Sequence, residues 1–265
     1  MQQEKKHTGH GDHWNSVIEG FTDTKIGEVL TEITNTGEKV LKSSDGQYAL
    51  IIKYQSPIQG ASLVRIVDGK NQLVSAFPIL RIDNILHITI EGVSANDEAG
   101  EGYIQGTARS GIELDFFDPL FCINRSKYEI GKEYAFNMGA ILYHFEERKE
   151  NLEFVADSGP EKGKTFKMRN TTAFTMTDFY GEFQFATPFR GFVSEFEFKG
   201  SKFAQLVYKS NSGLTGDPEE FSFPMIIRKD SLKNNEPKDG DPIMGSGWLQ
   251  GYLADSFDEF GKEEK

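Results

Sequence analysis

Cysteine is almost absent from this sequence. Cys122 is the single thiol, so intramolecular disulfides are excluded. A lone cysteine is typical of proteins that fold in a reducing compartment. Residues 1–7 lack the apolar core of a secretory signal, and no apolar run is long enough to span a bilayer. We therefore expect a cytoplasmic protein that does not cross a membrane.

Basic residues are scarce relative to acidic ones. The sequence contains 29 Lys and Arg against 41 Asp and Glu, which gives a formal net charge of -12. Nucleic-acid affinity depends on clustered Lys and Arg, and no run of these residues occurs here. A protein or peptide partner is therefore expected in preference to DNA or RNA.

Recognisable catalytic motifs are missing. The sequence has no G-x-S-x-G, H-E-x-x-H or paired C-x-x-C motif, and beyond the N-terminal residues its histidines are His87 and His144. Cys122 and His144 are the one nucleophile–base pair available, but the apolar surroundings of Cys122 are expected to raise its thiol pKa. Asp115 and Asp118 lie next to a turn and are interpreted as solvated. We predict no catalytic residues and no cofactor.

A glycine-rich motif occurs twice. Residues 100–106 and 245–251 both read Gly-x-Gly-aromatic-aliphatic-Gln-Gly. Glycine weakens a strand interior, so this density of glycines needs a structural reason. The preferred interpretation is a pair of curved barrel strands. The alternative is that the glycines clear space for a ligand beside a stacking aromatic ring.

The motif places four side chains in equivalent positions. Because side chains alternate along a strand, Tyr103 shares a face with Gln105, and Trp248 shares a face with Gln250. An aromatic ring beside an amide on a barrel surface is suited to stacking and hydrogen bonding with a ligand. Tyr103, Gln105, Trp248 and Gln250 are therefore the candidate binding residues.

A second pair of segments supports duplication. In each half of the chain, a short apolar strand is followed by a polar connector, a glycine turn and a long strand. The short strands are residues 117–122 and 223–227, and the long ones are residues 134–145 and 248–253. This order resembles the third strand, connector and fourth strand of five-stranded Greek-key barrels of the OB type. The resemblance is to an architecture and implies no family's functional residues.

We therefore predict an all-β fold with minor α content, built from two related OB-like Greek-key barrel modules in tandem. The N-terminal module covers residues 15–150, including an extra N-terminal segment, and the C-terminal module covers residues 165–254. Residues 146–167 are the predicted linker, because they begin with many charges and continue with Gly and Pro. Residues 1–14 and the acidic residues 255–265 are predicted to be disordered tails.

Alternation of apolar and polar residues predicts the individual strands. They are expected at 48–54, 62–67, 73–79, 85–93, 112–117, 120–123, 134–145, 191–198, 203–208 and 221–228. Residues 26–41 are ambiguous. Apolar positions at helical spacing favour a helix there, whereas residues 35–37 would suit a hairpin turn. The helix is the preferred interpretation.

Three histidines, His7, His10 and His13, lie close to Asp12 in the predicted N-terminal tail. Imidazoles at this density can bind Zn, Ni or Cu ions, so these three are the candidate metal ligands. A terminus without apolar anchors is typically disordered, and adventitious metal binding is easily achieved. Disorder is therefore favoured over a functional metal site.

The predicted function is that of a non-catalytic cytosolic binding protein that recognises a protein or peptide partner. The alternative is an OB protein that binds single-stranded oligonucleotides, with a basic groove concealed by the acidic average charge. A metal-assisted hydrolase is the third and least favoured hypothesis. No sequence signal indicates an oligomeric state.

Overall fold

The fold is mostly β, as predicted. The computed structural model describes residues 6, 10–20, 22–37, 39–53, 57–149, 151–155, 162–168, 171–210, 221–232 and 236–256. Strands account for 56% of the structure and helices for 16%. The helices are α1 (His10–Val17), α2 (Asp23–Thr36) and α3 (Phe121–Asn124), and the 3-10 turns are η1 (Arg125–Lys127) and η2 (Lys229–Leu232). The all-β class with minor α content is confirmed.

The first sheet is a four-stranded antiparallel meander that carries α2 on one face. Its strands are β1 (Lys39–Lys42), β2 (Tyr48–Lys53), β3 (Ile58–Val67) and β4 (Lys70–Leu80). The Thr22 hydroxyl caps α2 by accepting a hydrogen bond from the backbone N of Lys25. Ile33 packs so closely on Gly60 of β3 that a Cβ there would lie 2.6 Å from the isoleucine side chain. The preferred helix is thus confirmed up to Thr36.

The central element is a closed five-stranded barrel. Its strands are β5 (Ile85–Asn96), β6 (Glu101–Ala108), β7 (Glu113–Phe117), β8 (Glu133–Glu147) and β16 (Pro242–Leu253). The meander β5–β6–β7 is antiparallel, β8 pairs with β5, and β16 closes the ring by pairing antiparallel with β8 and parallel with β7. This order, with α3 and η1 between β7 and β8, is that of an OB-type Greek-key barrel.

Both copies of the glycine motif belong to this one barrel, the first in β6 and the second in β16. Two separate barrels in tandem are therefore not confirmed. The glycines serve close strand approach at both places: a Cβ on Gly106 would meet the backbone of β5, and one on Gly251 would lie 2.7 Å from the Phe116 ring. Local sequence similarity here reflects a shared packing need within the same ring of strands.

Between the fourth and fifth strands of the barrel, the described residues contain seven inserted strands. They are β9 (Leu152–Val155), β10 (Thr165–Met168), β11 (Ala173–Met176), β12 (Glu182–Pro188), β13 (Ser194–Phe198), β14 (Ser201–Lys209) and β15 (Ser222–Arg228). β9 and β10 pair with each other, which replaces part of the predicted linker 146–167 by a hairpin, although residues 156–161 lie outside the described residues. The other five strands extend the barrel sheet on two sides.

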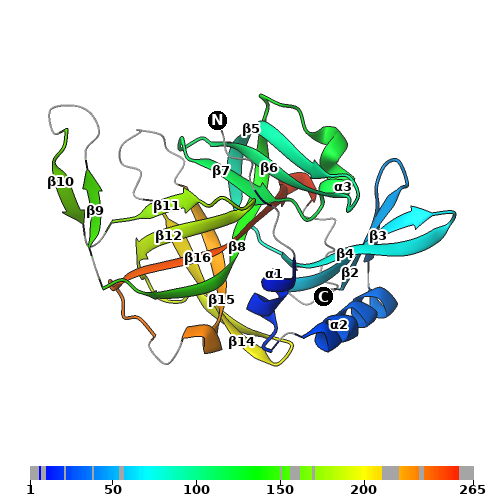
Figure 1. Ribbon diagram of the computed structural model, residues 1–265, viewed down its shortest axis with the longest axis horizontal. Coiled ribbons are helices and arrows are strands. Elements are labelled where there is room, and N and C mark those ends of the chain that lie inside the picture. The colour runs from blue at the N-terminus through cyan, green and yellow to red at the C-terminus, as the bar shows by residue number, and fades with distance from the viewer. Residues whose placement is uncertain are drawn as a thin grey trace.

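The extension makes a ten-stranded sheet in the order β11-β12-β16-β7-β6-β5-β8-β15-β14-β13. β8 and β16 extend from the barrel into the inserted sheet, so each pairs with barrel strands at one end and with inserted strands at the other (Figure 1). One apolar cluster continues from the barrel interior, around Phe116 and Leu249, to Phe183 and Phe223 of the inserted strands. The insertion and the barrel therefore share a core.

The N-terminal residues correct the predicted disordered tail. Residues 10–14 form the first part of α1, which packs against β4 and β8. His13, Trp14 and Val17 are buried, and the Trp14 indole donates a hydrogen bond to the Ala76 carbonyl at 3.0 Å. Trp14 and Val17 are the apolar anchors of this helix. Trp14 is the last residue of the predicted tail and Val17 lies just beyond it, so the tail was predicted to be disordered from the polar residues that precede them.

Two further predictions concern residues 120–123, after β7, and the acidic residues 255–265. Residues 120–123, predicted as a strand, enter α3 instead, because the Asp118 carboxylate accepts a hydrogen bond from Leu120 N at 2.8 Å and turns the chain. Of the predicted acidic tail, residues 257–265 lie outside the described residues, while Ser256 is buried.

Within the described part of the chain, no helix is long and apolar enough to cross a membrane.

Candidate functional site

The outer face of the barrel brings the predicted aromatic residues together. OB barrels bind ligands on their second and third strands, which here are β6 and β7. Tyr103, Phe117 and Trp248 point outward from β6, β7 and β16, with ring centroids 5.4 Å apart for Tyr103–Phe117 and 5.0 Å for Phe117–Trp248. Tyr103 and Trp248 are only 2% and 0% exposed. The predicted aromatic face exists, but it is covered.

Helix α1 covers this face with its two histidines. The His13 ring lies flat on Trp248, with centroids 3.7 Å apart and an interplanar angle of 5°. The His10 ring lies 5.1 Å from Phe117, and its Nε2 is 2.9 Å from Glu101 Oε1. An imidazole of the chain itself therefore occupies the position in which a planar ligand would stack.

The two histidines hydrogen bond to each other through their Nδ1 atoms, 3.0 Å apart. If His10 Nε2–H donates to Glu101, then His10 Nδ1 accepts from His13 Nδ1–H, and His13 Nε2 carries a lone pair. That Nε2 atom is buried without a hydrogen-bond partner. Burial, reinforced by the neighbouring His10, lowers the pKa of His13 well below its ordinary value, which keeps the ring neutral.

The predicted metal ligands do not assemble into a metal centre in the described residues. His7 lies outside them, and His10 and His13 direct their Nδ1 atoms at each other. No group of three or more His, Cys, Asp or Glu side chains suited to a metal ion occurs in the described part of the chain. His10 and His13 instead connect α1 to the barrel through Glu101 and Trp248.

The two glutamines predicted to bind a ligand, Gln105 and Gln250, contact other parts of this protein. Gln250 is 2% exposed, and its amide donates to the Pro78 carbonyl at 2.8 Å and accepts from Leu80 N at 3.0 Å. It thereby joins the barrel to the end of β4. Gln105 packs over Gly92 of β5, where a Cβ would collide with its side chain. Both glycine-motif glutamines contact the protein's own chain.

Asp115 and Asp118, interpreted as solvated from the sequence, are buried at 3% and 1% exposure. Asp115 accepts a hydrogen bond from Gly181 N, and Asp118 accepts one from the Tyr128 hydroxyl. Burial raises the pKa of Asp118 to about 7 despite these bonds. The interpretation failed because the inserted residue Gly181 and the residues after β7 fold over this turn.

The predicted absence of a reactive thiol agrees with the environment of Cys122. Burial, together with the charge of Asp118, raises the pKa of Cys122 to about 12, so the reactive thiolate is scarce at neutral pH. Cys122 is buried in α3, whereas His144 is exposed on β8. These environments do not suit a nucleophile and its base.

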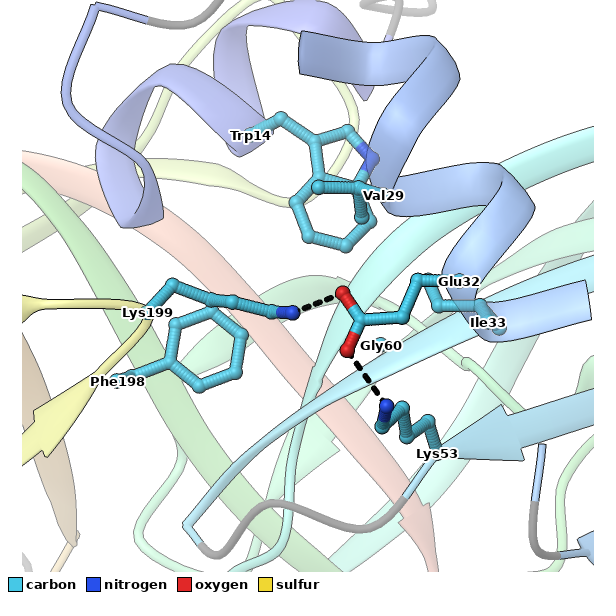
Figure 2. Close-up of a pocket in the computed structure, with 8 residues that line it drawn as sticks. All are labelled: Trp14, Val29, Glu32, Ile33, Lys53, Gly60, Phe198 and Lys199. Atoms are coloured by element: carbon cyan, nitrogen blue, oxygen red, sulfur yellow. Dashed lines mark hydrogen bonds and ion pairs between the residues drawn. The ribbon is translucent and has the colours of Figure 1, made fainter. Parts of the chain in front are cut away.

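A second candidate lies between α2 and the β13–β14 turn (Figure 2). The Glu32 carboxylate is shared by two ammonium groups, Lys53 at 2.5 Å and Lys199, and the hydrogen bonds from Lys199 and then Lys53 lower the pKa of Glu32. The hollow beneath Trp14 measures about 10 Å³, room for no more than a water molecule. This cluster joins the first sheet to the inserted strands and leaves no unpaired charge for a ligand.

The third candidate is an open pocket of about 360 Å³ on the inserted sheet. It is lined by side chains of four adjacent strands, β8, β16, β12 and β11. The residues are His144, Glu146, Ala173, Thr175, Gln184, Phe185, Ala186, Met244, Gly245 and Ser246. None of these residues is Lys or Arg, so the lining does not suit a phosphate backbone.

Strand register arranges most of these side chains in two rows. His144, Ser246, Gln184 and Thr175 are direct neighbours across the four strands and form a polar row. His144 Nδ1 and Ser246 Oγ are 3.4 Å apart within it. Two residues away on each strand, and therefore on the same face, a second row is formed by Glu146, Met244, Ala186 and Ala173.

The second row accounts for the pocket. The side chains of Ala173 and Ala186 are short and leave space above the sheet, and Met244, which is 42% exposed, stands beside that space. Sequence reasoning missed this pocket. The polar residues alternate with apolar ones in each strand, which is a signal, but their alignment depends on pairings between distant strands.

No family model, curated protein or solved structure matches this chain.

Proposed function

We propose that this is a non-catalytic, cytosolic binding protein that recognises a peptide or protein partner, and that it does so at the pocket on β8, β16, β12 and β11. The observation that carries the proposal is the pocket itself: about 360 Å³ of open space with a polar row beside an exposed methionine. Convergent polar groups beside apolar surface are what a recognition site requires.

The charge of the protein supports a peptide in preference to an oligonucleotide. The net charge is -12, and Glu146 and His144 are the ionisable side chains of the lining. An acidic surface attracts basic segments and repels phosphates. Lys and Arg side chains of a partner would meet Glu146, while its apolar side chains would contact Met244.

The alternative function, binding of single-stranded oligonucleotides, is favoured by the OB-type barrel. It requires an accessible aromatic face to stack bases. In this molecule Trp248 is 0% exposed beneath His13, and Phe117 is 0% exposed. The buried state of this face supports the peptide proposal over the oligonucleotide one.

The proposed function is tested by offering both ligand classes to the full chain. A phage-displayed library of random peptides is selected on the immobilised protein, and enriched peptides are synthesised with a fluorophore for anisotropy. Fluorescent single-stranded oligonucleotides are measured at low salt in parallel. We expect enrichment of peptides and no oligonucleotide binding.

The matched variants are Met244→Lys, in the pocket, and Val193→Lys, outside it. Both side chains are exposed, at 42% and 65%, so a charge is tolerated at each. Met244→Lys is expected to weaken peptide binding about tenfold or more, because it removes the apolar contact and repels a basic segment, whereas Val193→Lys leaves binding unchanged. Tight, salt-sensitive oligonucleotide binding without peptide enrichment would overturn the proposal.

A further inference from the structure

The pocket is bounded by a strand at the edge of its sheet. β11 has β12 as its one neighbour among the described strands of the ten-stranded sheet. Edge strands present unpaired backbone N–H and C=O groups, and natural proteins commonly protect them with charged side chains.

Two other edge strands are protected in this way. At the opposite edge of the same sheet, β13 carries Glu195 and Glu197, both exposed. At the edge of the first sheet, β1 begins with Lys39 and ends with Lys42. β11 reads Ala-Phe-Thr-Met and carries no charge. It is thus the edge strand without charged protection beside the open pocket.

We propose that β11 accepts an added β-strand from an extended peptide segment of a partner protein. This inference rests on the proposed function and specifies its binding mode, β-augmentation. The backbone of the segment pairs with the edge of β11 that none of the described strands occupies, and its alternate side chains continue the two rows of the pocket. The segment is apolar and basic in character, because it meets Met244 and the acidic surface.

The rows indicate what each position of the partner segment requires. The position opposite Thr175 continues the polar row, and the position opposite Ala173 continues the row of alanines. Because Ala173 and Ala186 are short, a long side chain opposite Ala173 can lie across both of them towards Met244. The other face of the segment flanks the half-buried Phe174 and Met176 and is therefore suited to apolar residues.

A second copy of this chain fits the edge less well than a peptide does. If two β11 strands paired with each other, the side chains brought to the pocket would be Ala173 and Thr175. Both are small and would leave most of the 360 Å³ space empty. A partner segment with longer side chains at alternate positions fills that space, which is why we assign the site to a heterologous segment.

The test scans the backbone of a peptide selected on the full-length protein. Each residue in turn is N-methylated, and binding is measured by fluorescence anisotropy. In an added strand every second N–H faces β11, so methylation is expected to weaken binding about tenfold or more at alternate positions and to have little effect between them.

Two protein variants accompany the scan: Thr175→Lys on β11 and Ser194→Lys on β13. Both native side chains are exposed edge-strand residues. Thr175→Lys is expected to weaken binding about tenfold, because a charged edge residue opposes strand addition and repels a basic segment, whereas Ser194→Lys leaves it unchanged. Circular dichroism of each variant confirms that the fold is retained.

The outcomes separate this inference from the proposed function. If peptides bind and Met244→Lys removes binding, but the methylation scan has no two-residue period and Thr175→Lys has no effect, the edge inference is wrong and the pocket proposal stands. If no peptide is enriched at all, the proposed function fails. If the chain instead forms dimers that Thr175→Lys dissociates, the edge is used by a second copy and the heterologous assignment is overturned.

Discussion

Asp118 illustrates at the scale of one residue how tertiary burial changes chemistry. Its carboxylate lies at the end of β7, 1% exposed, and accepts hydrogen bonds from Leu120 N and the Tyr128 hydroxyl. Two bonds do not compensate for the loss of hydration, so the pKa rises from 3.8 to about 7. The folded protein therefore holds a proton that the unfolded chain releases above pH 3.8.

Because the folded protein holds this proton, we predict that Asp118→Asn changes how the free energy of unfolding depends on pH. Because the folded carboxyl pKa is raised, Asp118 stabilises the fold least above pH 7, and its contribution is lost as the pH rises from about 4 to about 7. Asparagine keeps an acceptor for Leu120 N without the charge. The stability of the variant relative to wild type is expected to increase over this interval by on the order of 4 kcal/mol.

The measurement is urea denaturation of both proteins at several pH values. Taking the difference between the two proteins is essential, because the lowered pKa of His13 acts in the opposite sense: its contribution is lost as the pH falls below about 6.5. Parallel stability curves for wild type and Asp118→Asn would contradict the assigned pKa.

At the scale of elements, α1 determines which surfaces of the barrel are available. It lays His13 flat on Trp248 and His10 against Phe117, so it covers the aromatic face that an OB barrel uses for ligands. The helix is held by a stack, the His10–Glu101 bond and the anchor Trp14. Under the proposed function, the partner binds at the inserted sheet instead.

The contribution of the stack is measurable with His13→Ala. The His13 side chain is fully buried, so its removal leaves a cavity over Trp248 and is expected to lower the free energy of unfolding by about 3 kcal/mol. Asn15→Ala, an exposed position of the same helix, serves as the control and is expected to change it by less than about 0.5 kcal/mol. Equal effects in urea denaturation would show that the stack does not hold α1 in place.

At the scale of the whole molecule, β16 decides that the fold has one barrel. This last strand pairs with β8 and β7, which precede the insertion, and also with β12 from the insertion. Gln250 in β16 additionally bonds to the end of β4. Every layer of the molecule therefore depends on a strand near its C-terminal end.

This arrangement predicts that residues 165–254 do not fold as an isolated fragment. Without β7 and β8, β16 keeps β12 as its one partner, and the apolar cluster around Leu249 is exposed. We expect an NMR spectrum of the fragment with poor dispersion, while the full chain gives a dispersed β spectrum. A folded fragment would instead support two independent modules.

Much of the fold was predictable where the signal is local. Alternation predicted β2, β5, β7 and β8, and residues 134–145 were correctly identified as the fourth strand of an OB barrel. The short strand expected at 117–122 was misplaced, because the third strand, β7, ends at Phe117 and residues 121–124 form α3. The predicted residues Tyr103 and Trp248 do lie on one aromatic face with Phe117. Side-chain alternation decides which residues share a face, and that information is contained in the chain itself.

The remainder was not predictable because it depends on contacts between distant residues. The repeated glycine motif indicated two barrels, but the same packing need arises at β6 and β16 of one barrel. The pocket rows from His144 to Thr175 likewise exist only once β8, β16, β12 and β11 are paired in register. No short-range pattern encodes those partners.

The amino-acid sequence by itself determined the β-rich class, the strand faces, the acidic charge and the absence of a disulfide, because each follows from residue type and spacing. Only the tertiary structure decided that β16 closes the first barrel, that α1 covers its aromatic face and that a pocket opens beside β11. The physical reason is that strand alternation is a local property, whereas the choice of pairing partner depends on which distant apolar faces are buried together.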